Sequence, residues 1–329
     1  MTTARQRFGD ANRTRQPCAA RRATAACHGM RRTGRCLRCM LAGLLLCVLP
    51  ALAQALAIVD DRGVAIELPG PARRIVSLAP HITELLFAAG AGNSVVGAVE
   101  YSNYPPAAQR LPKVGDVNAL DLERIVALEP DLVMVWQQGS PQGQLDVLAA
   151  LGLPVYYNQP RSLDEIARTL ERFGELAGTR ATADAAARDF RRRLSALRAR
   201  YRGRDTVTVF HQIWDQPLMT VNGEHLISQV LALCGGRNVF GELAPLVPHV
   251  SIEAVLDADP EVIGAAGTGS AAAAGLGPWF GWPRLRAIAR GNVYVIDPDL
   301  ISRHSPRILD GAEQLCAALD AARAHRPSR

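Results

Sequence analysis

The alternation of apolar and polar positions over residues 74–160 predicts short strands and helices that follow one another. Apolar runs bounded by turn residues predict strands over 74–78, 94–99, 131–136 and 154–157. Apolar positions with helical spacing predict helices over 82–89, 122–128 and 142–150. Thr83 is the predicted N-cap of the first helix, and Gly90 its predicted end. Strands that alternate with helices through short Gly/Pro turns indicate a parallel sheet built of crossover units.

The next segment, residues 162–201, has no strand pattern and is rich in Ala, Arg, Leu and Glu. Gly178 and Thr179 interrupt it once, and residues 182–201 are predicted to form one helix roughly 30 Å long. We expect a helix of this length to be a rigid connector. Its arginines have few aromatic neighbours, which predicts a solvated helix face and no nucleic-acid partner.

The alternation then restarts, which predicts a second sheet-forming lobe. Strands are expected over 206–210, 261–265 and 292–296, and helices over 225–233 and 307–322. The predicted fold is therefore α/β: two Rossmann-like lobes with parallel-rich sheets, joined by one long rigid α-helix, with a ligand cleft between the lobes. The predicted segments are a leader (1–57), an N-terminal α/β lobe (58–160), a helical connector (161–203) and a C-terminal α/β lobe (204–325).

A weak internal repeat relates the two lobes. Residues 122–133 match residues 252–263, with Glu, Pro and a following acid in the same register. Glu123 and Glu253 open the repeated helices. One interpretation is a first-turn carboxylate stabilised by each helix dipole. The other, favoured by the matching contexts, is a pair of exposed acids, one per lobe, that dock onto basic pockets of a symmetric partner.

Composition and charge separate the leader from the rest of the chain. The 329 residues are 48% apolar and 21% charged, which excludes a disordered or fibrous protein. The net charge is +6, but residues 1–57 carry +9 and the remainder −3, so the basic character belongs to the leader. From Met30, which we expect to be the true start, a basic region precedes an apolar stretch over 40–52 and two overlapping Ala-x-Ala sites over 53–57. This order predicts a cleavable signal peptide and export to a bacterial periplasm.

The cysteines divide in the same way. Five lie in the leader, and only Cys234 and Cys316 lie beyond it. In an oxidising compartment these two are a candidate disulfide, and two buried free thiols are the alternative. A disulfide that closes a loop of about 80 residues would stabilise the fold by about 4–5 kcal/mol on the chain-entropy model.

Candidate chemistry points to binding and not to catalysis. Beyond the leader there is no G-x-S-x-G, H-E-x-x-H or phosphate-loop motif and no visible nucleophile–base pairing, so no enzyme is predicted. The histidines are dispersed without ligand spacing, so no metal site is predicted, and a site assembled by the fold stays open. Six of the 17 aromatic residues lie in or beside predicted loops, which suggests a flat hydrophobic ligand; core packing is the alternative. They are Tyr101, Tyr104, Trp136, Trp214, Trp279 and Trp282.

Several phrases of residues 74–320 resemble a known family. They are Ser77-Leu78-Ala79-Pro80, Tyr101-Ser102-Asn103-Tyr104-Pro105-Pro106, residues 122–133, Cys234-Gly235-Gly236-Arg237-Asn238, Val250-Ser251-Ile252-Glu253 and Ser305-Pro306-Arg307. With them, the chain resembles the periplasmic cobalamin-binding proteins of ABC importers, in the helical-backbone class (class III). The resemblance implies a non-enzymatic, monomeric receptor with no resident cofactor or metal. It would deliver a corrinoid to the permease dimer of an importer at the inner membrane.

The resemblance also implies roles for single residues. Tyr101 and Trp136 match aromatic ligand contacts of the family, and Asp299 and Arg303 match polar ones. Glu123 and Glu253 would dock onto arginines of the permease, and Cys234 would pair with Cys316. Aromatic side chains of the best-known family member are replaced here by three aliphatic residues, Val117, Ile213 and Val247. Trp214, next to Ile213, is expected to compensate as a ligand contact. The alternative ligand of the same fold is haem, a ferric siderophore or another metal chelate.

Overall fold

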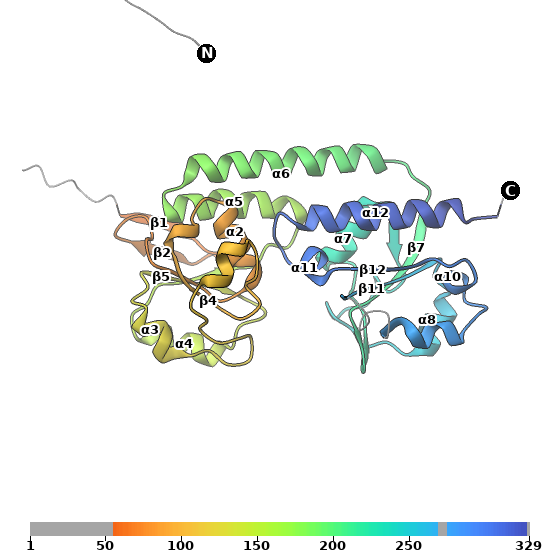
Figure 1. Ribbon diagram of the computed structural model, residues 1–329, viewed down its shortest axis with the longest axis horizontal. Coiled ribbons are helices and arrows are strands. Elements are labelled where there is room, and N and C mark those ends of the chain that lie inside the picture. The colour runs from red at the N-terminus through yellow and green to blue at the C-terminus, as the bar shows by residue number, and fades with distance from the viewer. Residues whose placement is uncertain (1–54, 269–274, 328–329) are drawn as a thin grey trace, which may run out of the picture. The chain divides into compact units, whose positions relative to one another are not determined.

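The structure is a computed structural model that describes residues 55–268 and 275–327 (Figure 1). Most of the predicted signal peptide lies outside the described residues. Within these two ranges, none of the helices combines the length and the apolar character needed to cross a membrane.

The first lobe is built on a four-stranded parallel sheet, as predicted. Its order is β4 (Val95–Ala98), β3 (Ile75–Ser77), β5 (Leu132–Trp136) and β6 (Val155–Asn158). The registers place Ile75 opposite Leu132 and Val133 opposite Val155. Nearly all of these strand residues are buried, which explains their continuous apolar runs. An antiparallel hairpin of β1 (Leu56–Val59) and β2 (Ala65–Leu68), which the sequence pattern did not predict, precedes the sheet.

Three helices complete the first lobe: α2 (Pro80–Ala88), α3 (Leu122–Ala127) and α4 (Gln142–Ala150). The start of α2 differs from the prediction. Ala79 is its N-cap and Pro80 is at the first helical position, where a residue without an N–H is favoured. Thr83 lies inside the helix, and its buried hydroxyl donates to the Ala79 carbonyl oxygen at 3.3 Å. The prediction of Thr83 as N-cap was therefore wrong.

The connector contains α5 (Leu163–Ala177) and α6 (Arg180–Tyr201), separated at Gly178 in the left-handed conformation (φ 70°). In Figure 1, α6 runs beside α5 and then beside the last helix of the chain. Its buried positions recur every three or four residues: Ala183, Ala187, Phe190, Leu194, Leu197 and Tyr201. Arginines on its outer face form ion pairs with α5 and with the last helix, such as Arg198–Asp164 (2.7 Å) and Arg193–Asp310 (2.6 Å). Most of the arginines of this helix, such as Arg188, Arg192 and Arg200, are exposed, so the face is solvated as predicted and also carries ion pairs.

The second lobe repeats the architecture. Its parallel sheet has the order β10 (Gly236–Asn238), β7 (Val207–Gln212), β11 (Val262–Ala266) and β12 (Val293–Ile296). A short antiparallel hairpin joins β8 (Trp214–Asp215) to β9 (Leu218–Met219). The helices are α7 (Leu226–Leu233), α8 (Ile252–Ala258), α10 (Arg286–Ala289), α11 (Pro298–Ile301) and α12 (Ile308–Ala324). One buried apolar cluster runs from the first sheet through α5 and α6 into α7 and α12, so the lobes share a continuous core.

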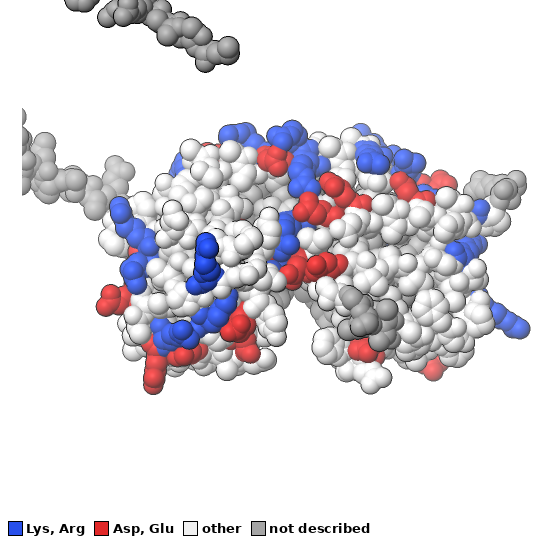
Figure 2. All heavy atoms as spheres, in the orientation of Figure 1, with Lys and Arg blue, Asp and Glu red and all other residues white. Residues whose placement is uncertain are grey.

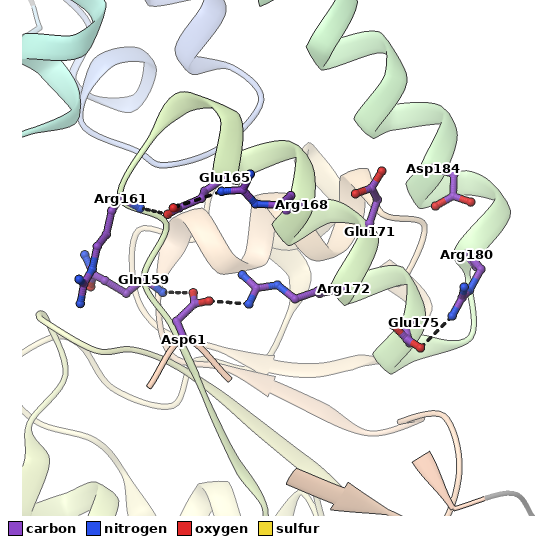
Figure 3. A pocket seen from close by; sticks show the side chains of 10 residues that line it. All are labelled: Asp61, Gln159, Arg161, Glu165, Arg168, Glu171, Arg172, Glu175, Arg180 and Asp184. Atoms are coloured by element: carbon purple, nitrogen blue, oxygen red, sulfur yellow. Dashed lines mark hydrogen bonds and ion pairs between the residues drawn. The ribbon is translucent and has the colours of Figure 1, made fainter. Parts of the chain in front are cut away.

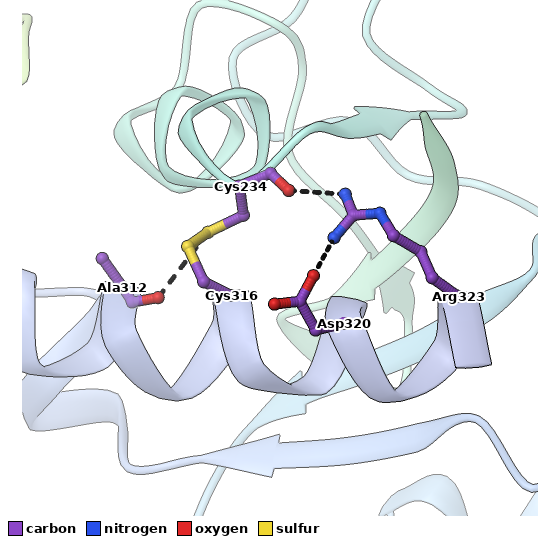
Figure 4. Close-up of a disulfide and its surroundings, with 5 residues drawn as sticks. All are labelled: Cys234, Ala312, Cys316, Asp320 and Arg323. Carbon is purple, nitrogen blue, oxygen red and sulfur yellow. Dashed lines mark hydrogen bonds and ion pairs between the residues drawn. A yellow bond between two sulfur atoms is a disulfide. The ribbon is translucent and has the colours of Figure 1, made fainter. Parts of the chain in front are cut away.

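The predicted disulfide is present. Cys234, at the end of α7, is bonded to Cys316 on α12 across 82 residues, and both side chains are fully buried (Figure 4). Arg323 braces the junction, since its guanidinium donates to the Cys234 carbonyl oxygen at 2.7 Å and to Asp320 at 2.7 Å. The bond therefore fastens the closing helix to the body of the second lobe.

Candidate functional site

A cavity of about 640 Å³ lies between the two lobes. This volume falls in the range typical of small-molecule sites. The first lobe contributes Trp136, Gln138 and residues 159–161, and the remaining wall residues come from the second lobe: Ile213, Glu224, His225, Leu226, Ile227, Gln229, Leu246, Ser302 and His304. Figure 2 shows a notch between the lobes on the side that faces away from α6. The predicted location of the ligand cleft is thus matched by a cavity lined from both lobes.

Trp136 is the aromatic side chain in this wall. It ends β5, and its indole stands perpendicular to His81 (85°, centroids 5.6 Å apart) and to His304 (85°, 6.2 Å). Gly139 makes this position possible, because a Cβ there would lie 1.9 Å from Cε3 of the indole. The indole Nε1 is buried and has no hydrogen-bond partner among the described residues. The ring therefore brings a large apolar surface to the cavity, while its buried Nε1 is left unpaired.

Two histidines of the wall are held neutral by burial. His225 is the N-cap of α7, and its Nδ1 accepts from the Ile227 backbone N–H at 3.1 Å. Burial lowers the pKa of His225 to about 4. Burial, together with the nearby His225, lowers the pKa of His304 to about 4. Both imidazoles are consequently uncharged at neutral pH. No sequence pattern identified them, because they lie 79 residues apart in segments without ligand spacing.

Arg303, Asp299 and Tyr101 lie together in a network that joins the lobes. The Arg303 guanidinium donates to Glu84 (2.7 Å) and Asn103 (2.7 Å) through Nη1, and to the Tyr101 carbonyl oxygen (3.0 Å) through Nη2. It also pairs with Asp299 at 2.6 Å, and Asp299 accepts from the Asn103 amide at 2.9 Å. The ring of Tyr101 is exposed. Three of the predicted ligand residues are thus neighbours, but the protein itself engages the polar atoms of two of them.

Glu84 is the centre of this network, although no role for it was predicted from the sequence. It lies on α2 with a side chain only 2% exposed. Besides Arg303, it accepts from the Ser305 hydroxyl (2.7 Å) and from two nitrogens of Arg307 (2.6 and 3.0 Å). The hydrogen bond and charge of Glu84 raise the pKa of Arg307. One buried carboxylate of the first lobe therefore binds three polar side chains at alternate positions of the segment that leads into α12.

The other predicted aromatic contacts lie in different environments. Trp214 is exposed on the β8–β9 hairpin, where its indole N–H donates to the Gln216 carbonyl oxygen at 3.0 Å. Its neighbour Ile213 lines the cavity, whereas Trp214 does not contribute to the wall. Trp279 is a core residue whose N–H donates to Gln212 at 2.8 Å. Trp282 borders a separate surface hollow.

The internal repeat is a structural repeat. In each lobe a short helix, α3 or α8, precedes a central strand, β5 or β11, and the residue before the shared Pro has a positive φ (Glu129, 46°; Asp259, 35°). Glu123 and Glu253 are exposed in the first turns of these helices. Hydrogen bonds from its own backbone N–H and from the Ser251 hydroxyl lower the pKa of Glu253. In Figure 1, α3 and α8 lie on the same side of the two lobes, away from α6.

A second cavity, of about 630 Å³, lies where the β1–β2 turn meets α5 and α6 (Figure 3). Five acids and four arginines line it, many of them paired, as in Arg172–Asp61 (2.5 Å) and Arg180–Glu175 (2.8 Å). None of its lining residues in the described part of the chain is aromatic, and their charges nearly balance. The inter-lobe cavity is therefore the better candidate for a flat organic ligand.

Comparison with known proteins places the chain in a family. The profile of the family described as periplasmic binding protein matches residues 75–300. The vitamin B12-binding protein of Vibrio cholerae serotype O1 is 39% identical over 252 residues, which are 76% of this chain and 90% of that protein. The crystal structure of the periplasmic vitamin B12-binding protein BtuF of Vibrio cholerae superposes with a TM-score of 0.72 at 38% identity, covering 77% of this chain and 98% of that one. The periplasmic heme-binding protein RhuT of Roseiflexus sp. RS-1 gives a TM-score of 0.68 at 26% identity, covering 76% and 99%. The chain therefore belongs to the periplasmic binding protein family.

Proposed function

We propose that this chain is a periplasmic receptor that captures a corrinoid, cobalamin, in the cavity between its lobes and delivers it to an ABC importer. The observation that carries the proposal is this cavity, with Trp136 in its wall. It lies in a chain that is 38–39% identical to vitamin B12-binding proteins over 90% or more of their length. The function is binding and transport, in which the corrinoid is cargo and not a resident cofactor.

The chemistry of the wall suits such a ligand. A corrinoid is a large, flat, mostly apolar disc fringed with amide side chains. Ile213, Leu226 and Leu246 provide apolar surface, and the indole of Trp136 provides an aromatic one. Three glutamines, Gln138, Gln159 and Gln229, line the same cavity. Gln229 is held by backbone groups of Arg161 and Leu163, whereas Gln138, which accepts from Gln159 at 3.2 Å, can donate its amide N–H groups to the amides of the ligand.

A titration with cyanocobalamin, cobinamide and haemin tests the proposal. Tight one-to-one binding of cyanocobalamin, measured by calorimetry, is the expected result. Binding of cobinamide alone would mean that replacing the aromatic residues at positions 117, 213 and 247 removed contacts to the nucleotide side of the ligand. Binding of haemin without any corrinoid would refute the proposal.

Haem is the second candidate, and one observation favours it. His304 lines the cavity with an uncharged imidazole, and a haem iron takes an axial ligand of this kind. A shift of the Soret band on titration with haemin, lost on His304→Ala, would support this alternative.

Delivery is proposed to use Glu123 and Glu253. Both are exposed, they occupy equivalent places in the two lobes, and their helices lie on the side where the notch between the lobes opens (Figures 1 and 2). A permease dimer with a basic pocket on each subunit would engage both acids and cover the mouth of the notch. The double variant Glu123→Ala/Glu253→Ala is expected to lose docking to the cognate transporter in a pull-down with reconstituted permease. Unchanged docking would refute this assignment.

Export through a cleavable signal peptide is also proposed, and the pairing of β1 with β2 supports one of the two candidate cleavage sites. Cleavage after Ala55 leaves β1 whole, whereas cleavage after Ala57 removes the residues that pair with Leu68 and Glu67 of β2. The proposed mature chain therefore begins at Leu56. Mass spectrometry of the protein from the periplasm tests this, and a start at Ile58 would contradict it.

A further inference from the structure

Two residues of the inter-lobe cavity wall, Trp136 and His304, form an unusual cluster of three rings with His81, which is not itself a wall residue. Their centroids lie 5.5 to 6.2 Å apart. Each ring has a buried nitrogen without a hydrogen-bond partner among the described residues: Nε2 of His81, Nε1 of Trp136 and Nδ1 of His304. Buried polar atoms are rarely left unpaired in a folded protein, so packing alone does not explain this cluster beside the cavity.

The two histidines of the wall differ in what they can offer. Because Nδ1 of His225 accepts from a backbone N–H, the proton of this neutral ring is on Nε2, and His225 can only donate to an occupant. His304 makes no hydrogen bond to the described residues that would fix its tautomer. Since its Nδ1 is the buried nitrogen, Nε2 is the one left to meet an occupant. A neutral imidazole with a free lone pair is a good ligand for a transition metal.

The peptide around His304 is held firmly. Its neighbour Arg303 is bound by Glu84 and Asp299, and its other neighbour Ser305 donates to Glu84 at 2.7 Å. Anchors on both sides fix the backbone that carries the imidazole. A ligand held in this way loses little conformational freedom when it binds a metal.

The orientation of Trp136 is compatible with a disc that His304 coordinates. An imidazole bound at an axial position stands perpendicular to the plane of the macrocycle. Trp136 is itself at 85° to His304, so its face can lie parallel to the same disc. The two rings then have different roles, one packing on the disc and the other reaching its metal.

We propose that His304 Nε2 is an axial ligand to the cobalt of the bound corrinoid. In this step the Nε2–Co bond forms, the Co–O bond to an axial water breaks, and the water leaves. Cobalt remains Co(III), and no proton or electron is transferred. The inference rests on the proposed function, since it specifies which corrinoids the site takes. Forms with an exchangeable axial water, aquacobalamin and diaquacobinamide, are preferred over cyanocobalamin, whose cyanide holds the position.

Absorption spectroscopy and calorimetry of the full exported chain test the proposal. Aquacobalamin and diaquacobinamide are expected to change colour on binding, as imidazole replaces water, whereas cyanocobalamin is expected to bind with an unchanged spectrum. In His304→Ala, the colour change should vanish, and the ratio of affinities for aquacobalamin over cyanocobalamin should fall at least about tenfold. His249→Ala is the matched control, because His249 is exposed and does not line the cavity. It is expected to behave as the unmodified chain.

The outcomes separate this inference from the proposed function. If both aqua forms bind with unshifted spectra, or if the shift persists in His304→Ala, the axial ligand is not His304 and only the inference fails. If no corrinoid binds, the proposed function fails as well. Far-UV circular dichroism and the thermal midpoint show whether His304→Ala is folded. Should it unfold, His304→Gln, which keeps a polar side chain, replaces it in the same comparison.

Discussion

Replacing Glu84 with glutamine tests how strongly one buried carboxylate holds the two lobes together. The variant keeps the size of the side chain but removes the charge that Arg303 and Arg307 share, and its amide N–H groups face their donors. Breaking a buried ion pair by removing one partner typically costs about 3–5 kcal/mol. In the variant, Arg303 still pairs with Asp299, and the Arg307 side chain is 19% exposed to solvent. The cost should therefore lie at the lower end of this range. We expect a loss of about 3 kcal/mol, or a fall of about 6–12 °C in the thermal midpoint.

The matched control is Glu313→Gln, which removes a carboxylate from an exposed pair. Glu313 lies 3.2 Å from Arg193, and its side chain is 55% exposed, so its loss should cost less than about 1 kcal/mol. Urea unfolding and differential scanning fluorimetry measure both variants. In a double-mutant cycle, Arg307→Gln should cost much less once Glu84 is already glutamine. The account is refuted if Glu84→Gln loses no more stability than the control.

Three further predictions concern stability and the cavity wall. Reduction of the disulfide between α7 and α12 should remove about 4–5 kcal/mol of stability, and an unchanged thermal midpoint in reductant would contradict this. Gly139→Ala places a Cβ 1.9 Å from the indole of Trp136, so it should displace the ring and weaken cobalamin binding in calorimetry. Gly143→Ala, where the added Cβ meets open space, should leave cobalamin affinity unchanged. Equal cobalamin affinities of the Gly139→Ala and Gly143→Ala variants would argue against the role of the indole. As the pH falls from about 6.5 to 4, the unfolded chain protonates His225 while the native state excludes the proton, so up to about 3 kcal/mol is lost. His225→Asn keeps an N-cap and should flatten the dependence of the unfolding free energy on pH in this window, and an unchanged slope would disprove the assignment.

Sequence periodicity predicted the main elements of the fold closely, because buried parallel strands and amphipathic helices have strong patterns. The strand expected over 131–136 is β5, and the helix expected over 182–201 is α6, which begins two residues earlier. The hairpins β1–β2 and β8–β9 were missed, since strands of two to four half-exposed residues have no distinct period. Thr83 was misassigned because the preference of Pro80 for a first helical turn outweighed a possible hydroxyl cap.

The candidate site was only partly predictable. Trp136 was identified as an aromatic residue at a strand end, a position that parallel sheets bring to a cleft. Neither His304 nor Glu84 was assigned a role from the sequence, although Glu84 lies in a phrase that resembles the family, because their contacts join segments more than 200 residues apart. Similarly, the contacts of Arg303 and Asp299 with the first lobe join segments about 200 residues apart, so the sequence did not show them.

The most direct test of the central claim is calorimetric titration of the chain from Leu56 with cyanocobalamin, compared between Trp136→Ala and Trp282→Ala. Trp136 lines the inter-lobe cavity, whereas Trp282 is an exposed indole beside a separate hollow. The account predicts one-to-one binding of cyanocobalamin to the unmodified chain and unchanged binding to Trp282→Ala. Binding to Trp136→Ala should be at least about tenfold weaker, because base–aromatic stacking of comparable rings contributes about 1–3 kcal/mol. An absence of cobalamin binding, or equal affinities of the two variants, would contradict it.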